Sequence, residues 1–148
     1  MTGVAGAAFA CVLVIAALMA PLLLPVQLKM TVTEDGLTIE PGGFDLIWTG
    51  RRRITVPAEQ ITSIRVLPRD QLPPKGVRFP GAHLRGVITA GSSGRGDDQV
   101  FWDIRRGAEL LVVYCRTGSR YRAYVLEFPD PHAVLGRAHA ALGRCTTA

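Results

Sequence analysis

The hydrophobic pattern divides the chain into an uncharged N-terminal run and a longer series of short alternating segments. The first 28 residues contain no charged side chain, and residues 4–26 are almost all apolar or small, interrupted by Pro21 and Pro25. Residues 2–20 contain no proline. As a helix they would rise about 28 Å, close to the roughly 30 Å hydrocarbon core of a bilayer. We therefore expect one transmembrane helix over residues 1–28.

Two alternatives to a membrane anchor remain open for this run. A cleaved signal peptide would need a basic start, an apolar core of about 7–15 residues and a small-x-small cleavage site. Here no Lys or Arg precedes the run, the run is longer, and residues 21–26 offer no such triplet. The other alternative is a buried helix of a soluble domain. An uncleaved single-pass anchor agrees best with the length of the run and its lack of charge.

The charges next to the run bear on its orientation. Lys29 is the nearest basic residue, and residues 51–53 are the next basic group. Because basic residues favour the cytoplasmic side, we expect the following domain in the cytoplasm, held at the cell membrane. Three scattered cysteines, Cys11, Cys115 and Cys145, do not form the even set that a disulfide framework requires.

The rest of the chain, residues 29–148, is long enough for one domain with a single core. Short apolar and alternating segments recur at intervals of roughly ten residues, which is typical of an all-β barrel or sandwich with seven or eight strands. Between them, residues 68–81 predict a long irregular connection, and residues 91–96 an exposed loop. The expected strands are residues 37–40, 44–48, 54–56, 61–67, 87–90, 100–104, 110–114 and 121–128.

The last expected strand leads into a helix. Within residues 121–128, alternation places Tyr121, Ala123, Val125 and Glu127 on one face, and the other four residues on the opposite face. Asp130 is then a good N-cap and Pro131 suits the first helical position. Gly143 is a natural C-terminal stop. The apolar stripe of this helix consists of Val134, Leu135, Ala138, Ala141 and Leu142.

This order of strands followed by one helix resembles the bacterial membrane-anchored pleckstrin-homology-like (PH-like) domains. Three segments carry the resemblance: residues 29–33 (KMTVT) directly after the apolar run, residues 76–86 (GVRFPGAHLRG), and residues 121–131 (YRAYVLEFPDP). It implies a PH-like seven-stranded β barrel or sandwich over residues 29–143, capped by one C-terminal α-helix, with residues 144–148 as a tail. Sandwich and barrel are not distinguished by the strand count.

The resemblance also implies a function. Understood members of the class act as binding or scaffold modules and not as enzymes. Many eukaryotic relatives bind inositol lipids through basic residues in the loop between the first two strands. The corresponding residues 33–36 (TEDG) are acidic in this chain, so no lipid-binding residue is carried over.

Basic residues provide the candidate binding site. The chain has 17 Lys and Arg against 12 Asp and Glu, a net charge of +5, which suits a protein partner with acidic groups or an anionic lipid surface. Alternation would divide residues 51–53 between two faces. Arg116, Arg120 and Arg122 flank an expected turn and are expected to form a solvated rim. The candidate residues, each of which could also be an ordinary solvated loop residue, are Arg51, Arg52, Arg53, Lys75, Arg78 and Arg85.

Catalytic and nucleic-acid functions find little support. His132 and His139 lie seven residues apart, too far for the i, i+4 pair of a helical zinc site. No CxxC pair, phosphate-binding glycine loop with lysine or nucleophile elbow is present. No known nucleic-acid motif accompanies the positive charge. We therefore expect no catalytic residues, metal, cofactor or nucleic-acid partner.

The leading hypothesis is a non-enzymatic binding, scaffold or regulatory module at the inner membrane surface. One alternative is an accessory subunit that docks on a membrane complex through small residues of the N-terminal helix, Gly3, Gly6, Ala7 and Ala10. A second is a binding protein that faces the cell envelope. The oligomeric state and the identity of the partner are left open by the sequence.

Overall fold

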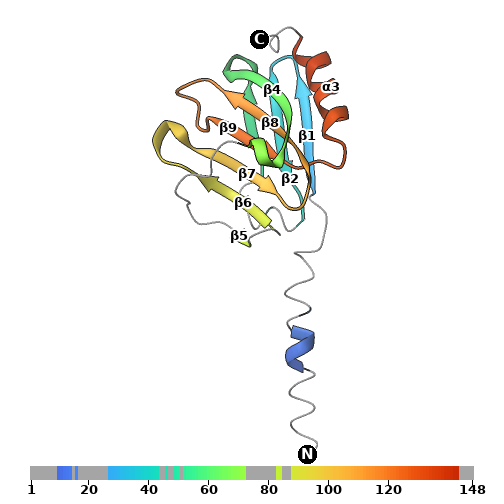
Figure 1. The fold of residues 1–148 in the computed structure, drawn as a ribbon. Helices are drawn as coiled ribbons and strands as arrows, with labels where there is room; N and C mark the ends of the chain where they lie inside the picture. Colours follow the sequence, from blue (N-terminus) through green and yellow to red (C-terminus); the bar gives the residue numbers. More distant parts are fainter. Residues whose placement is uncertain are drawn as a thin grey trace, which may run out of the picture.

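Among the residues that the structure describes, two β-sheets pack face to face, with a helix along one side (Figure 1). The computed structural model describes residues 10–14, 16, 27–43, 46, 49–50, 52–72, 83–84 and 88–143. We call the three-stranded sheet, in the order β1-β2-β3, sheet A, and the six-stranded sheet, in the order β4-β8-β9-β7-β6-β5, sheet B.

Sheet A is a simple antiparallel meander. Its strands are β1 (Leu28–Thr33), β2 (Gly36–Pro41) and β3 (Ile54–Pro57). The side chains that point inward are buried and aliphatic, namely Leu37, Ile39, Ile54 and Val56. The alternate positions are polar, so sheet A has one face on the core and one face open, as antiparallel sheets commonly do.

Sheet B is antiparallel apart from one pair of strands. Its strands are β4 (Ile61–Pro68), β5 (His83–Leu84), β6 (Ile88–Ser93), β7 (Val100–Ile104), β8 (Glu109–Cys115) and β9 (Ala123–Leu126). Short 3₁₀ helices η1 (Ala58–Gln60), η2 (Arg69–Gln71) and η3 (Gly96–Asp98) lie in the connections.

The exception is β9, which lies between β8 and β7 and runs parallel to β7. After β7 the chain first forms β8 and then returns as β9, which lies between these two strands. Val100 of β7 is opposite Ala123 of β9. As a result, the segments before β7 and before β9 end side by side at the same end of sheet B.

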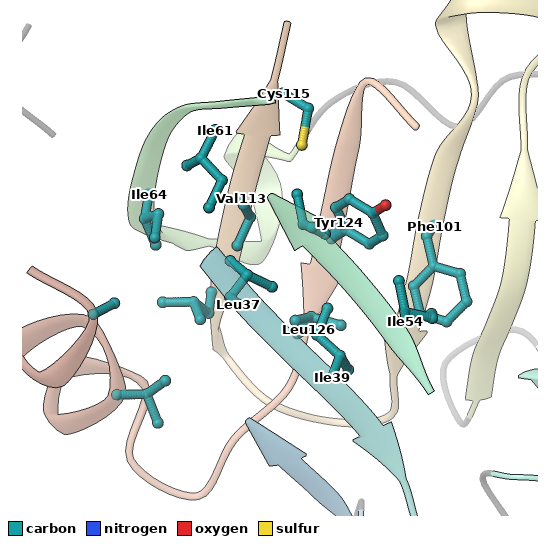
Figure 2. Close-up of a cluster of buried hydrophobic side chains, with 14 of the residues drawn as sticks. Leu37, Ile39, Ile54, Ile61, Ile64, Phe101, Val113, Cys115, Tyr124 and Leu126 are labelled. Carbon is teal, nitrogen blue, oxygen red and sulfur yellow. The ribbon is translucent and has the colours of Figure 1, made fainter. Parts of the chain in front are cut away.

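The central strands β7, β8 and β9 of sheet B are buried on both faces, which explains the continuous apolar run of β8. Val113 and Leu126 face sheet A in the larger core cluster, together with Phe101 (Figure 2). Leu111 belongs to the same cluster. A second cluster on the other face contains Trp102, whose indole N–H donates to the Ser93 hydroxyl at 2.7 Å. Strands buried on both sides lose the alternating pattern and become continuously hydrophobic.

Helix α3 (Pro131–Leu142) packs against β1, β4 and β8 and covers one side of the larger cluster. The Asp130 side chain accepts a hydrogen bond from the Ala133 backbone N–H at 2.9 Å, so it caps the helix. Val134, Ala138 and Leu142 are buried. The mainly β composition and this C-terminal helix agree with the sequence analysis, while a three-stranded and a six-stranded sheet replace the expected seven-stranded barrel or sandwich.

The predicted transmembrane helix over residues 1–28 is wrong. Among the residues that the structure describes, no helix is long and apolar enough to cross a membrane. Residues 10–14 and 16 are helical, and Leu28 already belongs to β1. A span needs about 20 consecutive residues. We therefore withdraw the predictions of a single-pass anchor, of membrane localisation and of a cytoplasmic domain, which all depended on that helix. Residues 1–9, 15 and 17–26 lie outside the described residues.

Three further expectations differ from the structure. Leu46 and Thr49 are helical, although residues 44–48 were expected to form a strand. Residues 91–93, expected in an exposed loop, form the end of β6, because Ser93 is buried and bonded to Trp102. Tyr121 packs in the larger cluster instead of pointing to the opposite face from Tyr124, because regular β9 begins only at Ala123. The predicted tail, residues 144–148, lies outside the described residues.

Candidate functional site

The outer face of sheet A presents polar side chains from all three strands. Alternation directs these side chains away from the core that the inner face buries. Lys29, Thr31, Thr33 and Thr55 are exposed, and the central-strand residues Thr38 and Glu40 are half-buried between their neighbours. We call these six residues, together with Arg53, the outer face.

A charged row crosses one end of the outer face. Lys29 of β1 lies directly opposite Glu40 of β2. On the other side, Arg53 donates to the Glu40 carboxylate, with Nη2 at 2.6 Å and Nε at 2.8 Å from Oε1. Such an exposed pair contributes only about 0–1 kcal/mol to stability. Its main consequence is to hold the Arg53 guanidinium, two-thirds exposed, against the sheet.

A threonine row lies next to the charged row. Thr31 is opposite Thr38, and Thr38 is opposite Thr55, so the three hydroxyl-bearing side chains cross the sheet in register. β-Branched residues favour strands, and each hydroxyl can donate and accept a hydrogen bond. The outer face therefore combines a rigid backbone with exposed donors, acceptors and charges of both signs.

Two of the six predicted site residues can be placed. Arg52 is exposed, and Arg53 is exposed and paired with Glu40. Arg51, Lys75, Arg78 and Arg85 lie outside the described residues. The structure thus brings Arg53 together with Lys29 and Glu40, which sequence reasoning did not connect. The sequence did contain a signal for this arrangement. The alternation in residues 29–33 and 37–40 places the side chains of Lys29 and Glu40 on the solvent-facing side of the sheet.

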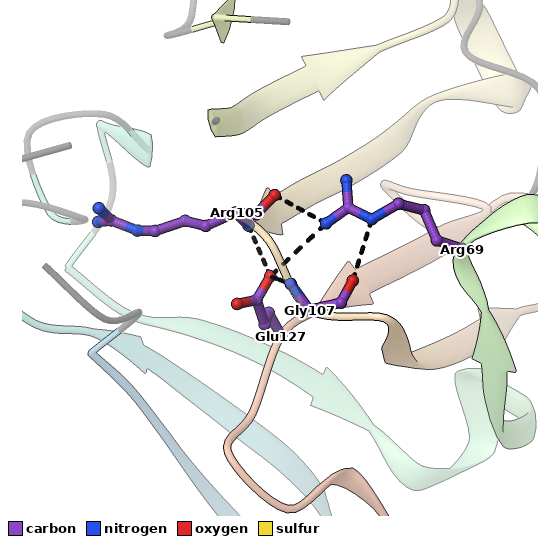
Figure 3. Close-up of polar contacts among 4 residues, drawn as sticks. All are labelled: Arg69, Arg105, Gly107 and Glu127. Carbon is purple, nitrogen blue, oxygen red and sulfur yellow. Dashed lines mark hydrogen bonds and ion pairs between the residues drawn. The ribbon is translucent and has the colours of Figure 1, made fainter. Parts of the chain in front are cut away.

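A second polar cluster, at the turn between β7 and β8, is structural (Figure 3). One carboxylate oxygen of Glu127, Oε2, accepts from the backbone N–H groups of Arg105 at 2.7 Å and of Gly107 at 2.9 Å. Arg69 donates to the carbonyls of the same two residues, at 2.7 and 3.0 Å. A Cβ at Gly107 would lie 2.9 Å from Glu127 Cδ, so glycine permits this close approach. These bonds fix the turn, and we call the group the hairpin lock.

Two further features of the described residues involve titratable side chains. His132 Nε2 lies 3.3 Å from Glu109 Oε2, and both side chains are more than half exposed. Among the described residues, no three His, Cys, Asp or Glu side chains gather in a way that could hold a metal ion. Cys115 is buried in the larger cluster, and burial raises the pKa of its thiol to about 11.

Cys115 is expected to resist thiol reagents in the folded protein. With a pKa of about 11, only about one thiol in a thousand is ionised at pH 8, and the side chain is buried. Mass spectrometry after brief iodoacetamide treatment at pH 8 should find Cys115 unmodified in buffer and modified in urea, with the exposed Cys11 as internal control. Equal modification of Cys115 under both conditions would contradict its burial.

Comparison with known proteins provides no relative. No protein-family model matches this chain, and neither does any curated protein or any solved structure. The PH-like resemblance therefore stays a prediction.

Proposed function

We propose that this chain is a non-enzymatic binding module that docks a protein partner on the outer face of sheet A. The observation that carries the proposal is the charged row of Lys29, Glu40 and Arg53 beside the threonine row. Both rows stand on strands whose inner side chains are buried in the larger cluster. A partner would therefore meet a surface that is already ordered and loses little conformational freedom on binding.

The charges favour a partner with an acidic patch. Lys29 and Arg53 outnumber Glu40 in the charged row, and the whole chain carries a net charge of +5. Complementary charges speed association and fix the orientation of the partner. Arginine is also enriched at protein interfaces, where its planar guanidinium can pair with carboxylates in bidentate geometry.

Site-specific photo-crosslinking tests the proposal. A photoreactive amino acid replaces Thr38, at the centre of the outer face, or Ala140, an exposed residue on helix α3, as the matched control. In the native cells, the Thr38 position is expected to give a discrete crosslinked product that the Ala140 position does not give. The crosslinked protein is then identified and purified. The same products from both positions, or none from Thr38, would contradict docking on this face.

A further inference from the structure

A turn of the chain at the opposite end of the sandwich carries an arginine pair on a rigid base. Residues 116–122 connect β8 to β9, and we call them the arginine turn. The parallel pairing of β7 with β9 places this turn beside residues 94–99, which precede β7. The outer-face residues Lys29, Glu40 and Arg53 lie at the other end of sheet A, because Thr33, Gly36 and Pro57 occupy the end that leads into η1.

Backbone hydrogen bonds fix the base of the arginine turn. The Arg116 N–H donates to the Gln60 carbonyl at 2.8 Å, and the Ser119 N–H closes the turn on the Arg116 carbonyl at 3.1 Å. At the other side, the Arg122 N–H donates to the Gln99 carbonyl at 2.7 Å. Two neighbouring segments therefore hold the turn, so its side chains project from a defined backbone.

Arg120 stands on an aromatic platform. Its guanidinium carbon lies 5.7 Å from the centre of the Tyr121 ring, within the range of a cation–π contact. Tyr121 is buried and makes edge contacts with Phe101 and Tyr124, with ring centres 5.7 and 5.3 Å apart. The platform is thus part of the larger core cluster, which limits the positions that Arg120 can take.

Of the three arginines in the arginine turn, one is held in an ion pair and two are available to a ligand. Arg122 is paired with Asp98, Nη1 to Oδ1, at 2.7 Å. Arg116 and Arg120 are exposed, and neither makes an ion pair with another of the residues that the structure describes. Thr117 and Ser119, which carry hydroxyl groups, lie between these two arginines in the sequence. Gly118 lies there too, and a Cβ added to it would meet no atom within 4 Å.

We propose that the arginine turn binds a phosphate group carried by a partner peptide. A phosphate monoester has close to two negative charges and three strong acceptor oxygens, which complement the positive charge and the donors of two arginines and two hydroxyl groups. Arginine clusters on a folded surface are a recurrent means of recognising phosphorylated segments. This site is separate from the outer face of sheet A, so either proposal can hold without the other.

Binding of a degenerate library of phosphoserine peptides to the full chain tests this proposal. The library is compared with its unphosphorylated counterpart, and the best retained peptide is then titrated by calorimetry. We expect retention of phosphorylated peptides only. The double substitution Arg116→Ala/Arg120→Ala is expected to lower the affinity for the titrated peptide at least about tenfold. The matched control Arg95→Ala/Arg106→Ala removes the same charge from exposed arginines elsewhere and should change affinity less than about twofold.

Two results would overturn the proposal, and one variant separates geometry from charge. If both double variants weakened binding of the peptide equally, the loss of affinity would be an effect of net charge. Inorganic phosphate that binds as tightly as the best peptide would make the turn a site for the free anion. Arg120→Lys retains the charge but removes the guanidinium group that lies over the Tyr121 ring. It should therefore weaken binding of the peptide, and an unchanged affinity would contradict the role of the platform. Circular dichroism of each variant verifies that the fold is retained.

Discussion

Phe101→Ala is expected to lower the free energy of unfolding by about 3–5 kcal/mol, the largest loss that we predict for a single substitution. Phe101 is 1% exposed and belongs to the larger cluster, which contains residues of both sheets. It also contacts both Tyr121 and Tyr124. The substitution removes the buried ring and leaves a cavity in the larger cluster. Urea denaturation followed by circular dichroism measures the change.

Two companion variants make this result specific. Phe101→Leu retains most of the buried volume, so its loss should be clearly smaller. Thr55→Ala removes an exposed side chain from the outer face and should change stability by less than about 1 kcal/mol. A loss for Phe101→Ala no larger than that for Thr55→Ala would show that the two sheets do not meet through this ring.

Glu127→Ala is expected to lower the free energy of unfolding by about 2–4 kcal/mol. The carboxylate accepts two backbone hydrogen bonds in the hairpin lock, and its removal leaves the N–H groups of Arg105 and Gly107 without that acceptor in a half-buried turn. Its partner Arg69, with Nη2 3.9 Å from Oε2, would keep its bonds to the two carbonyls. Thermal and urea unfolding both measure the loss.

The conservative variant separates geometry from charge in the hairpin lock. Glu127→Gln retains an acceptor oxygen but not the negative charge, so we expect about half of the loss or less. Glu59→Gln, at an exposed position in η1, is the matched control and should have no measurable effect. If Glu127→Ala were as stable as the control, the bonds to the turn would contribute nothing to folding.

Local features of the fold could be predicted from the sequence. The alternation of Leu37 and Ile39 predicted β2, and Pro41 marks its last residue. Asp130, Pro131 and the stripe that includes Ala138 predicted α3, because capping and helical periodicity depend on neighbouring residues only. These signals lie within about a dozen residues, where sequence patterns are most informative.

Long-range pairings could not be predicted in this way. The parallel pairing of β9 with β7 depends on how β8 is placed between β4 and β9, and no local pattern records that order. The N-terminal run shows the reverse problem. Its composition predicted a transmembrane helix, whereas the described part of the chain contains no helix of sufficient length and apolarity.

The candidate site was predicted in part. The density of charge in residues 51–53 identified Arg52 and Arg53, but not the role of Glu40, which lies 13 residues before Arg53 and reaches it through the register of β2 with β3. Arg116 and Arg120 were expected to form an ordinary solvated rim. The platform under Arg120 became visible only once Tyr121 was found in the core, against the alternation expected for residues 121–128.

The most direct test of docking on the outer face is the affinity of the crosslinked partner, once purified, for charge-reversed variants. We expect Arg53→Glu to weaken binding about tenfold or more, because it places a negative charge beside Glu40 and opposes an acidic partner. Arg106→Glu, at an exposed turn residue outside the outer face, makes the same change in net charge and should weaken binding less than about threefold. Equal affinities for the two folded variants would contradict docking on the outer face.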